Sequence, residues 1–343
     1  MEFLGKTKIK WTYVTHRVDR ALAAGILPVS GEPEVGAIVL GRVKNVGKNK
    51  EVEDTTGRRL TLFPGDVVAG ALGDRYATDQ YEGAALAEGA TGHLLSQGGV
   101  CGRVVSKNER MPDATDVEWI GRLADEEGRP LNLRRFAMRP RRGHHQPRPR
   151  TLLVVGASMN AGKTTTASQV IHSLSMRGRR VSAAKITGTA CRKDPMMMED
   201  AGALRVLDFS DCGFPSTANL PSRDLLGVAT DLRALLLEDE PEFTVYEIAD
   251  GILQRESRIL LEDPAFRETI DAVVYAAPES PSCEAGVRRL RESGYSVVAV
   301  AGMVANSRLG IAEAEAASGL PCLNGTMILD GALLLALDPA SVA

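Results

Sequence analysis

The sequence is poor in several features on which whole classes of protein depend. Aromatic residues make up 4% of the 343 residues, which leaves few rings on which unpaired bases could stack. Charge is nearly balanced, with 41 Lys and Arg against 44 Asp and Glu, whereas dedicated nucleic-acid binders have a basic excess. No apolar run reaches the roughly 18 residues of a membrane span, and the opening MEFLGKTKIKWTYVTHRVDR lacks the apolar core of a signal peptide. We therefore expect a cytoplasmic protein with no membrane partner, and nucleic acid is not the expected partner either.

Cysteine is also scarce, and its spacing excludes two further classes. The cysteines are odd in number and never form a C-x-x-C pair, so the sequence indicates neither a disulfide framework nor a zinc ribbon. His144 and His145 are too isolated in the sequence to predict a metal site. Reduced, buried thiols are expected at Cys101, Cys191, Cys212, Cys283 and Cys322.

The length and one change of composition predict the domain organisation. A chain of 343 residues exceeds the roughly 100–200 residues of a single domain. From Arg134 to Arg150, arginine and proline replace all apolar periodicity, which indicates a linker. These arginines could also hold an anion or nucleic acid, although a solvated connector is the commoner role of such runs. The prediction is a domain at 1–133, a linker at 134–150 and a second domain at 151–343.

The first domain contains short β-type runs separated by Gly and Pro turns, at 35–43, 59–63, 66–72 and 99–106. Their spacing predicts a small β-barrel or sandwich. We expect a helix at 17–24 and either helix or loop at 113–128. The segment 65–83 is crowded with Asp, Arg and Tyr, which fits a binding loop as well as a set of surface turns.

After the linker, apolar runs alternate with helical patterns. Such alternation is typical of a parallel sheet between two layers of helices. The predicted fold class is α/β, with a mostly parallel P-loop sheet covered by helices on both faces and preceded by a small β-rich, barrel- or sandwich-like domain. Strands are expected at 151–155, 180–185, 243–248, 271–276 and 296–304, with helices at 164–176, 285–293 and 310–318.

A phosphate-binding loop stands between the first strand and the first helix of the second domain. Small residues there let backbone N–H groups close around phosphate oxygens, and the helix N-terminus adds partial positive charge. Lys163 is placed to meet the terminal phosphates and Thr164 to bind magnesium. The loop has five residues between Gly156 and Gly162, one more than the common motif, and an accidental Gly-Lys-Thr is the alternative. The expected nucleotide-binding residues of the loop are Gly156, Asn160, Ala161, Gly162, Lys163, Thr164 and Thr165.

This spacing resembles that of dethiobiotin synthetase and the related cobyrinic acid amide synthases. Three further segments carry the resemblance: KITGT with Lys185, YEIADG with Glu247, and AGMVAN with Asn306. Asp200, in MMMEDAGAL, stands where that family has a metal-binding aspartate. The resemblance covers 151–322 and implies a homodimeric enzyme that uses ATP and Mg2+ to phosphorylate a carboxylate-type acceptor. In this family Lys163, Lys185 and Glu247 would be catalytic, and Asn306 would read adenine.

The chemistry of the residues supports a magnesium site beside this resemblance. Glu247 and Asp250 follow an apolar strand, so they lie at the carboxyl edge of the sheet, where open α/β folds bind ligands. Together with Thr164 and Asp200 they are the expected magnesium ligands. Glu199 and Asp200 could instead cap a helix.

Polar residues close to these positions are candidates for an acceptor site. Thr187 and Gly188 follow Lys185, which favours an anion site there. Arg192 and Lys193 could clamp a carboxylate or phosphate, with a solvated basic turn as the equal alternative. The stretch YEIADGILQRES departs from the glycine-rich segment of the family, so Arg255 offers a different contact and the acceptor is expected to differ from the family's own.

Two functions fit these motifs. The first is an ATP-dependent kinase or ligase acting on a small, acidic molecule. The alternative is a SIMIBI-type nucleotide switch, a GTPase- or ATPase-type regulator or metal-insertion protein in which hydrolysis acts on a protein partner. Asn306 is followed by Ser307 and Arg308 rather than by an N-K-x-D-like guanine-reading segment, which favours adenine. An ATPase that modifies nucleic acid is a third interpretation, which the low aromatic content disfavours.

Overall fold

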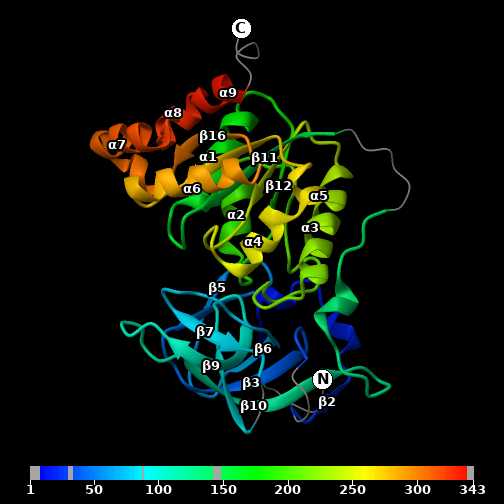
Figure 1. Cartoon of the computed structure of the whole chain (residues 1–343). Helices are drawn as coiled ribbons and strands as arrows, with labels where there is room; N and C mark the ends of the chain where they lie inside the picture. Colours follow the sequence, from blue (N-terminus) through cyan, green and yellow to red (C-terminus); the bar gives the residue numbers. More distant parts are fainter. Residues whose placement is uncertain (1–7, 30–33, 87–88, 142–147, 338–343) are drawn as a thin grey trace. The chain divides into compact units, whose positions relative to one another are not determined.

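The structure, a computed structural model, describes residues 8–29, 34–86, 89–141 and 148–337 (Figure 1). It divides into two compact units. The barrel unit runs to Arg139 and also includes two later segments, 188–193 and 209–219. The P-loop unit comprises 140–187, 194–208 and the chain from Leu220 onward. The sequence predicted one boundary, at the linker 134–150, and did not predict that two later segments belong to the first unit.

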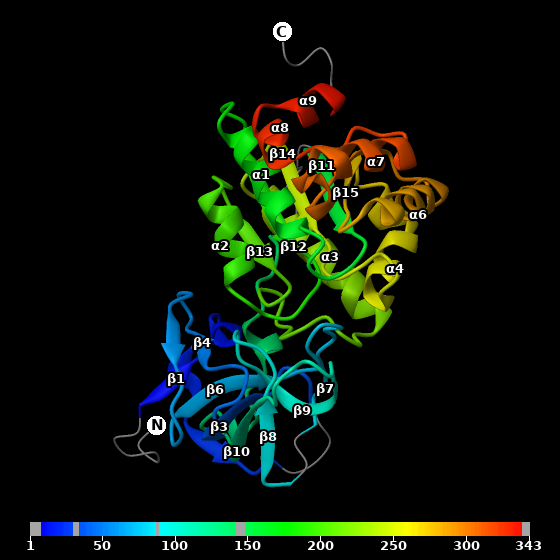
Figure 2. The same ribbon diagram turned by 90° about the vertical axis from the view of Figure 1, so that its left-hand side faces the viewer.

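Five strands of the barrel unit close on themselves (Figure 2). Four neighbouring pairs are antiparallel, and the parallel pair β6–β9 completes the ring, with Ala71 opposite Val100. Side chains such as Val39, Val68 and Leu94 are buried in its core. The β-rich domain is therefore a barrel rather than a sandwich. Its strands are β3 (Ile38–Asn45), β6 (Val67–Leu72), β8 (Thr91–Leu94), β9 (Val100–Lys107) and β10 (Thr115–Ala124).

Two expectations for the barrel unit were wrong. The stretch expected as helix or loop at 113–128 contains β10, in which Val117 and Leu123 are buried among more exposed charged neighbours. The helix expected at 17–24 is only the short 3-10 turn η3 (Arg20–Leu22). The other elements of the unit are β1 (Ile9–Trp11), η2 (Tyr13–Thr15), β2 (Gly25–Leu27), β4 (Glu51–Glu53), β5 (Arg59–Thr61), β7 (Tyr81–Ala84) and η4 (Leu133–Phe136).

The first residues of the arginine-rich stretch are folded. Arg134 and Arg135 lie in η4, where the guanidinium of Arg135 donates to Asp125 at 2.7 Å. The guanidinium of Arg134 lies 4.6 Å from the ring centroid of Phe214. The expected linker therefore begins inside the barrel unit, while His144 and His145 lie outside the described residues.

The P-loop unit is built on six parallel strands in the order β13-β12-β14-β11-β15-β16. Apolar side chains on one face, such as Leu152 and Val154, pack against Ile171 of α1. On the other face, Gly286 of α6 lies directly against the ring of Tyr275. The strands are β11 (Arg150–Gly156), β12 (Val181–Lys185), β13 (Val206–Asp208), β14 (Phe243–Glu247), β15 (Ala272–Ala276) and β16 (Val297–Ala301).

Helices cover both faces of this sheet, as the alternation of patterns predicted (Figures 1 and 2). Among the described residues, no helix is both long and apolar enough to cross a membrane. The helices are α1 (Lys163–Ser175), α2 (Lys193–Asp200), α3 (Ser222–Leu237), α4 (Arg255–Glu262), α5 (Pro264–Arg267), α6 (Ser280–Glu292), η5 (Met303–Asn306), α7 (Arg308–Ser318), α8 (Gly325–Leu329) and α9 (Ala332–Leu337).

Candidate nucleotide site

The loop between β11 and α1 has the backbone geometry of an anion cradle. Gly162 caps α1 with φ of 97°, and Asn160 also has positive φ, of 61°. Within α1, the first internal hydrogen bond that closes on the cap runs from Thr166 N–H to Gly162 O at 2.9 Å. The N–H groups of Lys163, Thr164 and Thr165 precede it and have no acceptor inside the helix. These donors, with the helix dipole behind them, make the start of α1 suited to phosphate.

Two other loops hold this loop in place through glycines. A Cβ on Gly251, which follows β14, would lie 2.1 Å from Ala157 O. A Cβ on Gly302, which follows β16, would lie 2.2 Å from Ala161 O. Only glycine allows these backbones to approach so closely. The conformation of the phosphate loop therefore depends on glycines outside it.

Lys163 folds back onto its own loop. Its side chain is buried, and Nζ donates to Ser158 O at 2.7 Å. Burial lowers the pKa of Lys163, while the nearby charges of Glu247 and Asp250 oppose that shift. A bound phosphate would offer the ammonium a charged acceptor in place of a neutral carbonyl, and charge-assisted bonds are the stronger ones.

Thr164 and Glu247 form the part of the site that fits magnesium. Thr164 Oγ1 donates to Glu247 Oε1 at 2.9 Å, and Glu247 is 1% exposed. The buried Glu247 Oε2 has no hydrogen-bond partner among the described residues. Burial raises the pKa of Glu247, and the charge of Lys185 opposes this. An orphaned carboxylate oxygen beside a hydroxyl is the donor chemistry that Mg2+ takes, with phosphate and water completing the shell.

Lys185 forms an ion pair with the carboxylate of Glu247. It is the last residue of β12, and its Nζ lies 3.8 Å from Glu247 Oε1. Nζ also donates to Asp194 Oδ2, in the first turn of α2. Lys163, Lys185 and Glu247, the three residues predicted as catalytic, are thus brought together at the carboxyl edge of the sheet, and their catalytic role stays a prediction.

The remaining predicted ligands lie in the loop after β14, at the end of α2 and at the end of η5. The charge of Asp250 acts on Lys163, and its backbone has φ of 59° in the loop after β14. Asp200 is exposed at the last residue of α2, at the opposite end from Asp194, so the alternative that it caps a helix start was wrong, and its metal role stays a prediction. Asn306 is exposed at the end of η5, where its Nδ2 lies 3.6 Å from Met303 Sδ. In the described part of the chain, no three His, Cys, Asp or Glu side chains form a metal-binding group by themselves.

The residues expected to bind an acceptor are divided between the two units. Thr187 is buried, and its Oγ1 accepts from Ala249 N–H at 2.8 Å, which ties β12 to the loop after β14. Gly188, Arg192 and Lys193 belong to the barrel unit. There Arg192 N–H donates to the buried Glu53 at 2.6 Å. Their role in binding an acceptor stays a prediction.

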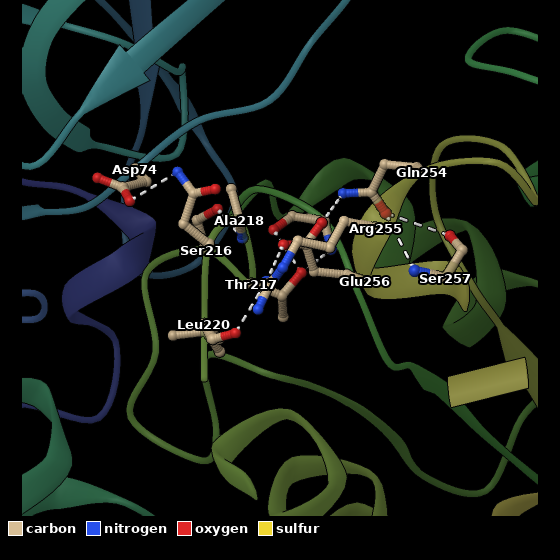
Figure 3. A network of polar contacts seen from close by, with 11 residues as sticks. Asp74, Ser216, Thr217, Ala218, Leu220, Gln254, Arg255, Glu256 and Ser257 are labelled. Atoms are coloured by element: carbon tan, nitrogen blue, oxygen red, sulfur yellow. Dashed lines mark hydrogen bonds and ion pairs between the residues drawn. The ribbon is translucent and has the colours of Figure 1, made fainter. Parts of the chain in front are cut away.

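Arg255 is the first residue of α4, and its side chain makes hydrogen bonds at the start of that helix (Figure 3). Its guanidinium donates to Leu220 O at 3.0 Å and to Glu256 Oε1 at 2.8 Å. The Gln254 side chain accepts from Ser257 N–H at 3.1 Å and donates to Glu256. These contacts order the helix start.

Three functional candidates escaped the sequence reasoning. The sequence motifs assign no role to Asp194, although an acidic residue in the first turn is a helix-start signal. The sequence motifs that contain Gly251 and Gly302 assign them no role, because these glycines act through contacts with a loop far away in sequence.

Comparisons with known proteins place the chain in no family. No family model and no curated protein matches it. Similar solved structures include the signal recognition particle 54 kDa protein of Aeropyrum pernix K1 in complex with GDP, at 21% identity and TM-score 0.39, covering 53% of this chain and 43% of that one. The signal recognition particle receptor FtsY of Elizabethkingia anophelis with GDP has 15% identity and TM-score 0.38, with 58% and 68% covered. The cell division protein FtsY of Thermotoga maritima has 17% identity and TM-score 0.37, with 55% and 65% covered. These scores are low, so we transfer no ligand or activity from them.

The resemblance to dethiobiotin synthetase was wrong. The similar solved structures named above are signal recognition particle proteins and their receptors, not dethiobiotin synthetases. The small-molecule kinase or ligase is therefore set aside. ATP and the adenine-reading role of Asn306 rested on that resemblance and on the segment after Asn306, which is not N-K-x-D-like; the base of the nucleotide and the homodimer stay predictions.

Proposed function

We propose that the chain is a nucleotide switch: it binds a nucleoside triphosphate with Mg2+ at the start of α1, hydrolyses it, and passes the nucleotide state to its barrel unit and through it to a protein partner. The phosphate loop, Thr164 and Glu247 support the binding step. In phosphoryl transfer the protein contributes mainly positioning and charge neutralisation, which two lysines and a magnesium site supply.

One observation carries the switch. Segments 188–193 and 209–219 follow β12 and β13 at the carboxyl edge of the sheet, yet both belong to the barrel unit. Segment 188–193 lies between Lys185 and Asp194, which pair with each other near Glu247. Residues that respond to phosphate are thus covalently continuous with a second folded body. A two-state element next to the γ-phosphate is the physical basis of nucleotide switches.

Hydrogen exchange with mass spectrometry tests this proposal on the full chain. The chain is compared in three states: without nucleotide, with the diphosphate, and with a non-hydrolysable triphosphate, using both guanine and adenine forms with Mg2+. We expect exchange in 188–193 and 209–219 to differ between the diphosphate and triphosphate states, and exchange in β3 to stay unchanged. Protection of the phosphate loop alone, identical in both bound states, would contradict the switch.

A further inference from the structure

Lys185 and Asp194 form an ion pair beside the predicted phosphate site. Lys185 ends β12 with a side chain 10% exposed, and Asp194 stands in the first turn of α2 with a side chain 24% exposed. The two residues enclose segment 188–193 and so close a small ring of chain. The ion pair itself lies within the P-loop unit.

The charge of Asp194 reaches further than Lys185. Burial lowers the pKa of Lys163 and raises the pKa of Glu247; the charge of Asp194 opposes the first shift and adds to the second, so the carboxylate acts electrostatically on both residues of the phosphate site. The Asp194 carboxylate therefore interacts electrostatically with both Lys163 and Lys185. A terminal phosphate held by Lys163 and Lys185 would take the same electrostatic position.

We propose that Asp194 is a built-in competitor of the terminal phosphate, whose carboxylate holds Lys185 in the nucleotide-free protein and is displaced when a triphosphate binds. The proposal rests on the proposed function and identifies the contact by which the terminal phosphate changes the state of the switch. A diphosphate has no terminal group to reach Lys185, so it leaves the ion pair closed. After release, Asp194 remains at the N-terminus of α2, where the helix dipole favours a negative charge.

Segment 188–193, which lies between Lys185 and Asp194 in the chain, connects the opening of this ion pair to the barrel unit. Within segment 188–193, Ala190 O accepts from Ser96 Oγ at 3.4 Å, and Arg192 N–H donates to Glu53 at 2.6 Å. The Arg192 guanidinium lies 5.9 Å from the ring centroid of Tyr13. Opening the Lys185–Asp194 pair removes a restraint between the two ends of a segment whose middle is fixed to barrel residues.

Asp194→Asn tests the proposal, because it keeps the shape of the side chain and removes its charge. Titration calorimetry of the full chain with Mg2+ and the non-hydrolysable triphosphate should show about tenfold tighter binding, within the usual range of coupling between sites. Diphosphate affinity should stay unchanged. Without nucleotide, residues 186–193 should exchange hydrogen faster in the variant than in the wild type.

Asp330→Asn is the matched control, since it removes the same charge from an exposed position of the same unit, at the end of α8. It should leave both affinities and the exchange unchanged. Weaker triphosphate binding by Asp194→Asn would overturn the proposal, because it would show that Asp194 holds Lys185 ready for phosphate. Unchanged triphosphate binding would overturn it as well. A wild-type chain that binds neither nucleotide would instead overturn the proposed function on which the proposal rests.

Discussion

Replacing Gly251 by alanine is the sharpest test of how the phosphate loop is held. The added Cβ would lie 2.1 Å from Ala157 O and 3.1 Å from the Cα of Ser158. Ordinary contact begins near 3.4 Å, so the two backbones must separate by about 1.3 Å, the difference between 3.4 and 2.1. A displacement of about 1 Å in a catalytic geometry costs on the order of 10²-fold. We expect nucleotide binding to weaken at least about tenfold and hydrolysis to fall about a hundredfold, although no side chain of the site is altered.

Gly227→Ala is the matched control. Gly227 lies inside α3, and a Cβ there meets nothing within 4 Å. Alanine in a helix interior is about 1 kcal/mol more favourable than glycine, so this variant should melt a few degrees higher and bind nucleotide normally. Calorimetric titration and thermal unfolding of both variants are the assays. Wild-type affinity in Gly251→Ala would refute the account of how the loop is positioned.

Two further predictions follow from buried groups. Thr164→Ala should destabilise the nucleotide-free chain by about 1–3 kcal/mol, because it leaves both oxygens of the buried Glu247 without a donor, and should abolish the effect of Mg2+ on nucleotide binding. Urea unfolding measures the first effect and nucleotide titrations with Mg2+ or chelator measure the second, with the exposed Thr230→Ala as control. Nucleotide binding that still depends on Mg2+ in Thr164→Ala would contradict the prediction. Burial raises the pKa of the Cys101 thiol to about 12 from 9.0, so the native state keeps a proton that the unfolded chain loses above pH 9.0. The free energy of unfolding should therefore fall with rising alkaline pH, by about 1.4 kcal/mol per pH unit for this group. Measured by urea unfolding at a series of pH values, the free energy of unfolding of Cys101→Ala should fall less steeply with pH than that of the wild type. An equal dependence on pH would argue against the raised pKa of Cys101.

The phosphate site shows what the sequence could predict and why. The run Thr151–Val155, the loop and the start of α1 were predicted to within a residue, because an apolar strand, small loop residues and a helix start are encoded locally. β10 was not predicted, because the alternation of buried Thr115 and Val117 with charged residues is interrupted before Leu123 by a bulge between Trp119 and Gly121.

The grouping of segments 188–193 and 209–219 with the barrel unit had no local signal. It depends on contacts between residues far apart in sequence, such as Gly98 against Ala190 O, where a Cβ would lie at 2.0 Å. The pairing of Lys185 with Asp194 likewise requires the chain to leave the sheet and return. For the same reason the membership of Gly188 and Arg192 in the barrel unit could not be read from their spacing.

The central claim is that a nucleoside triphosphate binds at the start of α1 with its terminal phosphates on Lys163. Its most direct test is calorimetric titration of the full chain with Mg2+ and GTP or ATP analogues, for the wild type, Lys163→Ala and the control Lys50→Ala, whose side chain is exposed in the barrel unit. The account predicts saturable binding by the wild type and the control, and about a hundredfold weaker binding by Lys163→Ala, since a charge-assisted hydrogen bond to phosphate contributes about 1.5–3 kcal/mol. Equal affinity in all three chains, or no binding of either nucleotide by the wild type, would contradict it.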